Sequence, residues 1–185
     1  MLKLNEEAVS DLIRPEVEGL VRVAVPDGYG TYFLPRVLSR FAQAHPRIVL
    51  EIDCGLTDDI AAALSEGRLD VALVVRKPED PRGEFLWAEP IDWVVSAKHE
   101  IHLEDPLPIA VFQHGCVMRA RALKALDASG RKWRIAYCSV SLAAIQGAVL
   151  SGLAVGVIGH SAVLPDMRVL GPGDGFATLP KLEFE

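Results

Sequence analysis

The 185-residue sequence lacks any run of eighteen apolar residues, which is about the length that a membrane-spanning helix needs. Its first seven residues, MLKLNEE, also lack the apolar core of a signal peptide. We therefore expect a cytoplasmic protein with no membrane partner. Cysteine is scarce: Cys54, Cys116 and Cys138 include no close pair, so neither a disulfide framework nor a zinc ribbon is predicted. Reduced, mostly buried thiols are expected instead.

Basic residues are outnumbered, with 19 Lys and Arg against 25 Asp and Glu and a net charge of -6. Proteins that bind duplex DNA draw much of their affinity from Lys and Arg side chains that neutralise phosphates. Six of the nineteen basic residues fall between Arg119 and Arg134, but this spacing fits a solvated helix face better than a basic patch. The chain itself is therefore not expected to bind DNA.

Signatures of cofactor binding and catalysis are also few. Gly28 and Gly30 follow the first predicted strand without the third glycine of a dinucleotide fingerprint, and there is no P-loop, so no cofactor is predicted. No histidine pair has a third ligand, which argues against a metal site. Cys116, beside His114 at a predicted helix start, has the setting of an activated thiolate, but closeness in sequence does not make a catalytic pair. No catalytic residue is therefore predicted.

What the sequence does contain is strands that alternate with helices. In the first half, Val21–Val25 alternates like a strand, Pro26–Gly30 forms a tight turn, and Thr31–Ala44 has apolar residues at helical spacing. The strand Ile48–Ile52 follows, then a helix with Asp58 and Asp59 in its first turn and Gly67 after its end, and then the nearly all-apolar strand Leu69–Val75. This order predicts an α/β fold with a mainly parallel sheet covered on both faces.

The second half repeats this alternation after a Pro- and charge-rich stretch at Lys77–Glu84. Pro90–Ser96 is expected to be a strand that leads into a second lobe, and Leu179–Phe184 a strand that returns to the first. Between them the sequence predicts three strands and two helices, at Pro108–Phe112, Arg119–Ser129, Trp133–Cys138, Ser141–Val149 and Ala154–Ile158. Two lobes with a cleft between them are the predicted architecture.

Ligands of open α/β sheets bind beyond the carboxyl ends of the strands, where helix N-termini offer unpaired N–H groups. Each strand-to-helix turn is therefore a candidate wall of the site: Asp27–Thr31, Gly55–Thr57, Arg76–Lys77, His114–Cys116, Ser139–Ser141 and Gly159–Ser161. Several residues of these turns also have a purely structural interpretation: Thr57 and Ser141 as helix caps, Gly28 and Gly30 as turn formers.

An ordered set of segments resembles the ligand-sensing half of LysR-type transcriptional regulators. The segments are Leu20–Ala24, Leu34–Pro35 before Phe41, His45–Pro46, Leu69–Leu73 and Ala148–Ile158. A further set, Phe112–Arg119, Ala125–Ala128 and Trp133–Tyr137, resembles the branch typified by the motility regulator LrhA. The resemblance implies a type 2 periplasmic-binding-protein fold, in which two Rossmann-like lobes, joined by two crossing strands, clamp a small metabolite. It also implies that DNA is bound only by a winged helix-turn-helix that this chain does not contain.

The same resemblance implies a division of the chain. Residues 1–19 would be the end of a linker helix, 20–95 the first lobe, 96–172 the second lobe and 173–185 a return strand to the first. The family usually continues with a further strand and helix, so more of the first lobe is expected beyond Glu185. Self-association as a homodimer, and as a tetramer of the full-length protein, is also implied. The helix Thr31–Ala44 is the candidate interface because it carries Tyr32, Phe33 and Phe41.

Carried over by position, the family's ligand wall falls on Asp27, Gly28, Tyr29, Thr57, Gly115, Cys116, Arg119, Ser139 and Ser141. The family's common effectors are anionic, and many relatives have a hydroxyl where this chain has Asp27. Because that acid would repel an anion, Arg119 and Lys77 are expected to offset its charge. Two alternative functions are a solute-binding protein of a transporter with the same fold and a small α/β enzyme that uses Cys116.

Overall fold

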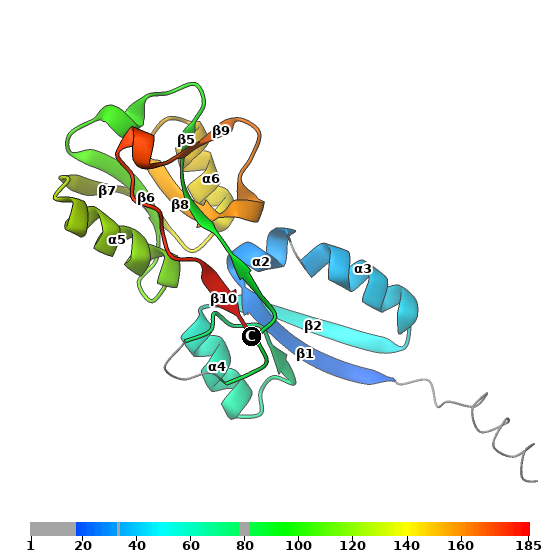
Figure 1. Cartoon of the computed structure of the whole chain (residues 1–185). Coiled ribbons are helices and arrows are strands. Elements are labelled where there is room, and N and C mark those ends of the chain that lie inside the picture. Colours follow the sequence, from blue (N-terminus) through cyan, green and yellow to red (C-terminus); the bar gives the residue numbers. More distant parts are fainter. Residues whose placement is uncertain (1–17, 33, 78–81) are drawn as a thin grey trace, which may run out of the picture.

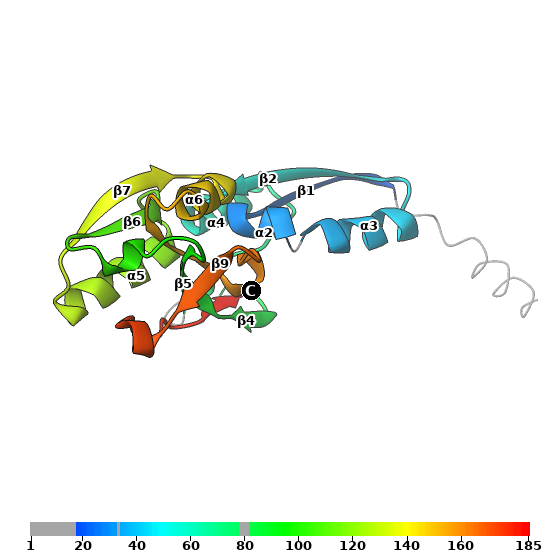
Figure 2. The ribbon, with the colours of Figure 1, turned by 90° about the horizontal axis from the view of Figure 1, so that it is seen from above.

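The computed structural model describes residues 18–32, 34–77 and 82–185, which form two lobes (Figure 1). The first lobe is built on three parallel strands in the order β2-β1-β3, and β1 becomes fully buried only near its carboxyl end, at Ala24 and Val25. Its elements are β1 (Gly19–Pro26), α2 (Asp27–Tyr32), α3 (Leu34–Ala44), β2 (Ile48–Gly55), α4 (Thr57–Ser65) and β3 (Val71–Ala72). Figure 2 shows β1 and β2 extending away from the second lobe with α3 alongside them.

The second lobe is built on a five-stranded sheet in the order β7-β6-β8-β5-β9. Here β6 pairs in parallel with β7 and β8, while β5 runs antiparallel to β8 and β9. Strands β6 and β8 are buried along their whole length, as expected of parallel strands covered on both faces. The elements are β5 (Ile91–Ser96), η1 (Ile101–Leu103), β6 (Leu107–Phe112), α5 (Val117–Ser129), β7 (Trp133–Ser139), α6 (Leu142–Leu150), β8 (Val155–Gly159), η2 (His160–Ala162), β9 (Met167–Leu170) and η3 (Pro172–Asp174).

Two antiparallel segments cross between the lobes. Strand β4 (Trp87–Glu89) leads from the first lobe to the second, and β10 (Leu182–Phe184) pairs with it on the way back. Backbone hydrogen bonds in both directions between Val74 and Glu185 attach this end of the chain to the first lobe. The Phe184 ring stacks on Trp87 at 4.7 Å between centroids and meets Tyr29 edge-on at 4.3 Å. The crossing is thus held by an aromatic cluster as well as by backbone pairing.

One hydrophobic core runs from the second lobe into the crossing, where it includes Val25, Tyr29 and Phe184. A smaller core lies under α4 and contains Ile60, Ala63 and Leu69, among others. Because the larger core is continuous across the crossing, the strands that join the lobes are also part of the packed interior. The cleft therefore has a rigid base.

The α/β class and the two-lobed architecture are confirmed, with local differences. The predicted turn at Pro26–Gly30 is the start of α2, which begins at Asp27, where an acidic side chain suits the first turn. Strand β5 already pairs within the second sheet, so the first crossing precedes Ile91 and does not wait until residue 96. The predicted strand Leu69–Val75 contracts to β3 and an isolated bridge at Val75, although Leu73 N still donates to Ala24 O.

The expectation of mostly buried thiols is wrong. All three cysteines are free, but Cys54 and Cys138 are exposed and Cys116 is half-buried. The reason is sheet order, because Cys54 lies on β2 and Cys138 on β7, and each is the edge strand of its sheet. On α4, Leu64 is exposed, and the buried residues are Ile60 and Ala63.

Some predictions fall outside the described residues. They are the linker helix, except for Glu18 and Gly19, and the side chains of Tyr32 and Phe33 in the candidate interface. Across residues 18–32, 34–77 and 82–185, no helix combines the length and apolar character needed to cross a membrane. In the same ranges, no group of three or more metal-ligating side chains comes together.

Candidate functional site

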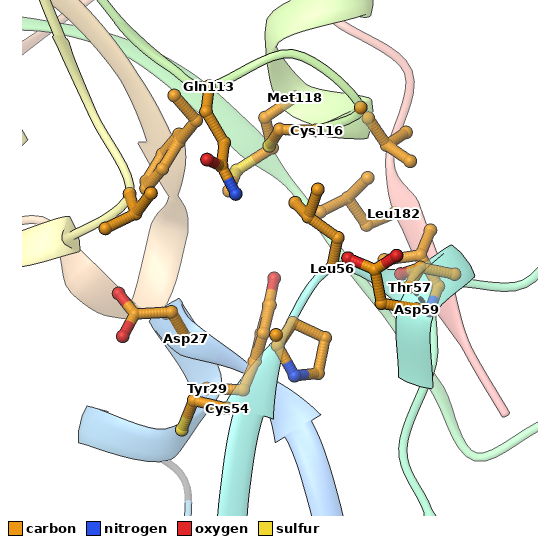
Figure 3. Close-up of a pocket in the computed structure, with 18 residues that line it drawn as sticks. Asp27, Tyr29, Cys54, Leu56, Thr57, Asp59, Gln113, Cys116, Met118 and Leu182 are labelled. Atoms are coloured by element: carbon orange, nitrogen blue, oxygen red, sulfur yellow. Dashed lines mark hydrogen bonds between the residues drawn. The ribbon is translucent and has the colours of Figure 1, made fainter. Parts of the chain in front are cut away.

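A cavity of about 430 Å³ lies between the lobes, at the carboxyl ends of β1, β2 and β6 (Figure 3). This volume is within the range of small-molecule sites, roughly 300–1,000 Å³. Its lining comprises Pro26, Asp27, Gly28, Tyr29, Cys54, Gly55, Leu56, Thr57, Asp59, Val75, Phe112, Gln113, Gly115, Cys116, Val117, Met118, Val140 and Leu182. Both lobes and the return strand β10 contribute, so a ligand here would contact both lobes and the crossing between them.

The first-lobe wall is made by the starts of α2 and α4. Thr57 was predicted as a cap, but it is the first residue of α4, whose N-cap is Leu56 with no side-chain cap hydrogen bond. The Thr57 hydroxyl oxygen instead accepts a hydrogen bond from Val75 N at 3.2 Å. It thereby ties α4 to the segment after β3 and still lines the cavity, where its O–H is free to donate.

The second-lobe wall is the turn from β6 into α5. Gly115 has a φ of +86°, a left-handed conformation that favours glycine, and a Cβ at this position would lie 3.0 Å from Leu56 Cδ1 of the opposite lobe. Cys116 is the N-cap residue of α5. Burial raises the pKa of the Cys116 thiol, and the backbone N–H groups of Arg119 and Met118 offset this only in part. The thiol is therefore poorly suited to act as a nucleophile at neutral pH.

Asp27 connects the two lobes directly. Its carboxylate oxygen Oδ2 accepts a hydrogen bond from Leu142 N, at the start of α6, over 3.0 Å. Ser141, which was predicted to cap this helix, occupies the N-cap position but makes no side-chain cap hydrogen bond. The acid of the first lobe therefore acts as the cap of a second-lobe helix, a favourable position for negative charge.

Tyr29 lies at the base of the cavity and is 5% exposed. Its hydroxyl has no hydrogen-bond partner among the described residues, and Figure 3 shows it pointing into the space between the walls. Burial, together with the nearby Glu89 carboxylate, raises the pKa of Tyr29, so the hydroxyl stays protonated. A buried hydroxyl without a partner is costly, and a ligand could supply the missing bond.

Six of the ten residues expected at the site line the cavity, and the structure places the other four elsewhere. Arg119 is buried, where its guanidinium donates to Phe112 O at 3.0 Å and approaches Cys138 Sγ and His114 Nε2. Lys77 pairs with Asp58 at 2.7 Å. The Ser139 hydroxyl accepts from Ser141 N, so it shapes its own turn. The predicted offset of Asp27 by Arg119 and Lys77 is not found, because both cations have other partners.

Leu56 and Val140 lie within the predicted walls Gly55–Thr57 and Ser139–Ser141, but sequence reasoning missed other lining residues, among them Gln113, Met118 and Leu182. Gln113 directly follows β6, so the rule that ligands sit beyond strand ends would have found it. Val140 lies between two predicted serines, and only the geometry of the turn shows which side chain faces the cavity. Leu182 carries no local signal, because it reaches the site through the long-range pairing of β10 with β4.

Comparison with known proteins agrees with this architecture. The model of the LysR substrate binding domain matches residues 14–174. The chain belongs to the LysR substrate-binding domain family. The LysR regulatory domain of Synechocystis CcmR, solved in complex with 2-PG, has the same fold: the TM-score is 0.72 at 18% identity, over 90% of this chain and 86% of that one.

Curated relatives in the LysR family are transcriptional regulators. The chain is 31% identical over 182 residues to DgdR of Burkholderia cepacia, covering 98% of this chain and 61% of that regulator. It is 26% identical over 184 residues to PecT of Dickeya dadantii, covering 100% of this chain and 58% of PecT. The chain therefore spans about three-fifths of the length of these relatives, and the remainder of a LysR regulator lies outside the compared region.

Proposed function

We propose that this domain senses a small-molecule effector and thereby controls DNA binding by a separate winged helix-turn-helix of the same regulator. The observation that carries the proposal is the cavity between the lobes, lined from both sides and from β10. Because a ligand there contacts both lobes, it binds the closed arrangement more tightly than the open one and shifts the population toward closure. Closure would then change the distance between the winged helix-turn-helix domains of the associated copies.

The test uses the domain and the full-length regulator together. A thermal-shift screen of the domain against a metabolite panel should find a compound that raises the unfolding midpoint. At a hundred times its dissociation constant, a ligand adds roughly 2.7 kcal/mol to the free energy of unfolding. The same compound should change the affinity of the full-length protein for its operator in a gel-shift titration. A compound that stabilises the domain but leaves operator binding unchanged at saturation would contradict the proposal.

Binding rather than catalysis is also part of the proposal. The buried Cys116 thiol has a raised pKa, and His114 faces Arg119 rather than the thiol, so no activated pair supports an enzyme. The curated relatives are regulators, which favours this reading over a transporter's solute-binding protein. The same proposal implies a cytoplasmic location and no membrane partner. It also implies that the regulator contacts DNA only through its winged helix-turn-helix.

Self-association is the remaining part of the proposal. Strand β2 is an edge strand of its sheet as far as the structure describes the chain. Leu20, Val37 and Val49 are large apolar side chains exposed on β1, α3 and β2. These three elements extend away from the second lobe (Figures 1 and 2). An exposed apolar surface beside a free strand edge favours a two-fold interface between copies of the domain.

A further inference from the structure

The charged side chains described in the cavity lining are all acidic. Asp27 and Asp59 are its carboxylates and stand on opposite sides of the space (Figure 3). Neither has an ion-pair partner among the described residues, and the lining includes no Lys, Arg or His from that part of the chain. The remaining lining side chains are mostly apolar. Asp27 is offset by the Leu142 N–H at the start of α6 and Asp59 is exposed, but neither acid faces a described cation, so the lining as a whole attracts a cation and repels an anion.

The cations that might have reversed this charge have other partners. The Arg119 guanidinium donates to the Phe112 carbonyl, and Lys77 Nζ lies 2.7 Å from Asp58. Freeing either group for a ligand would leave a buried carbonyl or an exposed carboxylate without its present contact. Neither cation therefore faces the acids of the cavity lining.

Two of the helix N-termini at the cavity already have an acidic side chain beside them. Asp27 accepts the hydrogen bond of Leu142 N at the start of α6, which is where an anionic ligand would gain most from backbone N–H groups. At the start of α4, Asp58 and Asp59 already supply negative charge in the first turn. A carboxylate or phosphate ligand at these two helices would have to displace the Asp27 carboxylate from α6 or approach Asp58 and Asp59 at α4. The first turn of α5, by contrast, contains no acidic residue.

A second, independent observation marks the site as incomplete without a ligand. The Tyr29 hydroxyl is more than nine-tenths buried, has no partner among the described residues, and is aimed into the cavity. Beyond it lies the Glu89 carboxylate, which is also buried, accepts a hydrogen bond from Ser161 N and helps to raise the pKa of Tyr29. A ligand ammonium can donate to the Tyr29 oxygen, and the acids around the cavity would stabilise its charge.

We propose that the effector is a small, largely apolar molecule carrying a protonated amine, held by Asp27, Asp59 and the Tyr29 hydroxyl. This inference rests on the proposed effector-binding function and specifies the chemical class of the effector. It replaces the anionic effector that the family's common ligands suggested. Tyr29 and the two acids are then the residues that determine specificity.

Matched probes test the charge directly. Benzylammonium, benzoate and benzyl alcohol share a ring and a length, as do hexylammonium, hexanoate and hexanol. Isothermal titration of the 185-residue chain should show that an ammonium probe binds at least about tenfold more tightly than its matched carboxylate. A carboxylate that binds as tightly as its ammonium partner would overturn the inference, as would the absence of ammonium binding up to about 10 mM.

Variants then locate the bound amine. D27N and D59N should each weaken ammonium binding several-fold and leave alcohol binding unchanged, whereas D53N, an exposed acid outside the lining, should change neither. Y29F removes only the unpartnered hydroxyl, so it should weaken ammonium binding without lowering the unfolding midpoint. Equal affinities in wild type, D27N, D59N and Y29F would refute the site. If a carboxylate binds the cavity instead, the effector-sensing function still stands, because that function is tested by operator binding.

Discussion

Single residues decide how this site is assembled, and Asp27 has the largest role. It closes one wall of the cavity and caps a helix of the opposite lobe through Leu142 N. We expect D27A to lower the free energy of unfolding by about 0.5–2 kcal/mol, the usual range for losing a cap. D27N keeps an acceptor oxygen and should retain most of that stability. Urea unfolding of the three proteins checks this, and equal losses for both variants would show that the charge matters more than the hydrogen bond.

The cysteines provide a second prediction at this scale. Burial raises the pKa of the Cys116 thiol, so a smaller fraction is ionised at neutral pH than for an ordinary cysteine. We expect Cys116 to react with iodoacetamide more slowly than the exposed Cys138, and its rate to keep rising at pH values above the ordinary thiol range. Mass spectrometry of a labelling time course measures both. C116S should keep the fold and the ligand response, and a turnover abolished by C116S would support the enzyme alternative instead.

His102 makes the free energy of unfolding depend on pH. Its Nε2 lies 3.0 Å from Arg168 Nη2, and because a guanidinium can only donate, this nitrogen must be unprotonated. Burial, followed by the Arg168 charge, lowers the pKa of His102. The unfolded chain then binds more protons, so this contribution to stability is complete above about pH 6.5 and falls as the pH drops toward the folded-state pKa.

Unfolding free energies at about pH 7.5 and about pH 5.5 measure this effect. Wild type should lose stability between the two values, and H102Q, which keeps an acceptor for Arg168, should lose less. A wild-type loss that H102Q reproduces in full would assign the pH dependence to groups other than His102.

At the scale of elements, the exposed faces of β1, β2 and α3 predict the mode of assembly. Val37 on α3 is 45% exposed, and we expect V37D to weaken self-association measured by sedimentation velocity at tens of micromolar. L103D is the matched control, because Leu103 is 67% exposed but lies on η1 in the second lobe. A monomeric wild type, or equal dissociation by both variants, would place the interface elsewhere.

Most elements could be predicted from the sequence, because local apolar periodicity and glycine signals specify them. Gly130, for example, directly follows the predicted helix Arg119–Ser129 and ends α5 in a left-handed conformation. The membership of Asp27, Tyr29 and Thr57 in the site followed from their place beyond strand ends. The partners of the polar groups could not be predicted. Asp27 to Leu142 N spans 115 residues, and the direction of Arg119 depends on a carbonyl of another element.

The whole molecule carries a net charge of -6, which leads to a prediction about DNA. Affinity for duplexes depends on Lys and Arg contacts to phosphate, and an acidic domain gains little from them. We expect no specific binding of this domain alone to operator DNA at physiological salt, measured by fluorescence anisotropy. The full-length regulator is the positive control, and submicromolar binding by the isolated domain would refute the prediction.

The bond between Asp27 and Leu142 N has a consequence for observing the molecule at work. The Leu142 amide proton is held by a residue of the other lobe, so solvent can exchange it only when the lobes separate or the start of α6 frays. Its exchange rate therefore sets an upper limit on how often the lobes separate, at a single backbone position and without any added label. A bound effector would lower the exchange rate of the Leu142 amide proton. Across a series of effectors, the size of this decrease would rank them by how strongly they stabilise the closed arrangement of the lobes.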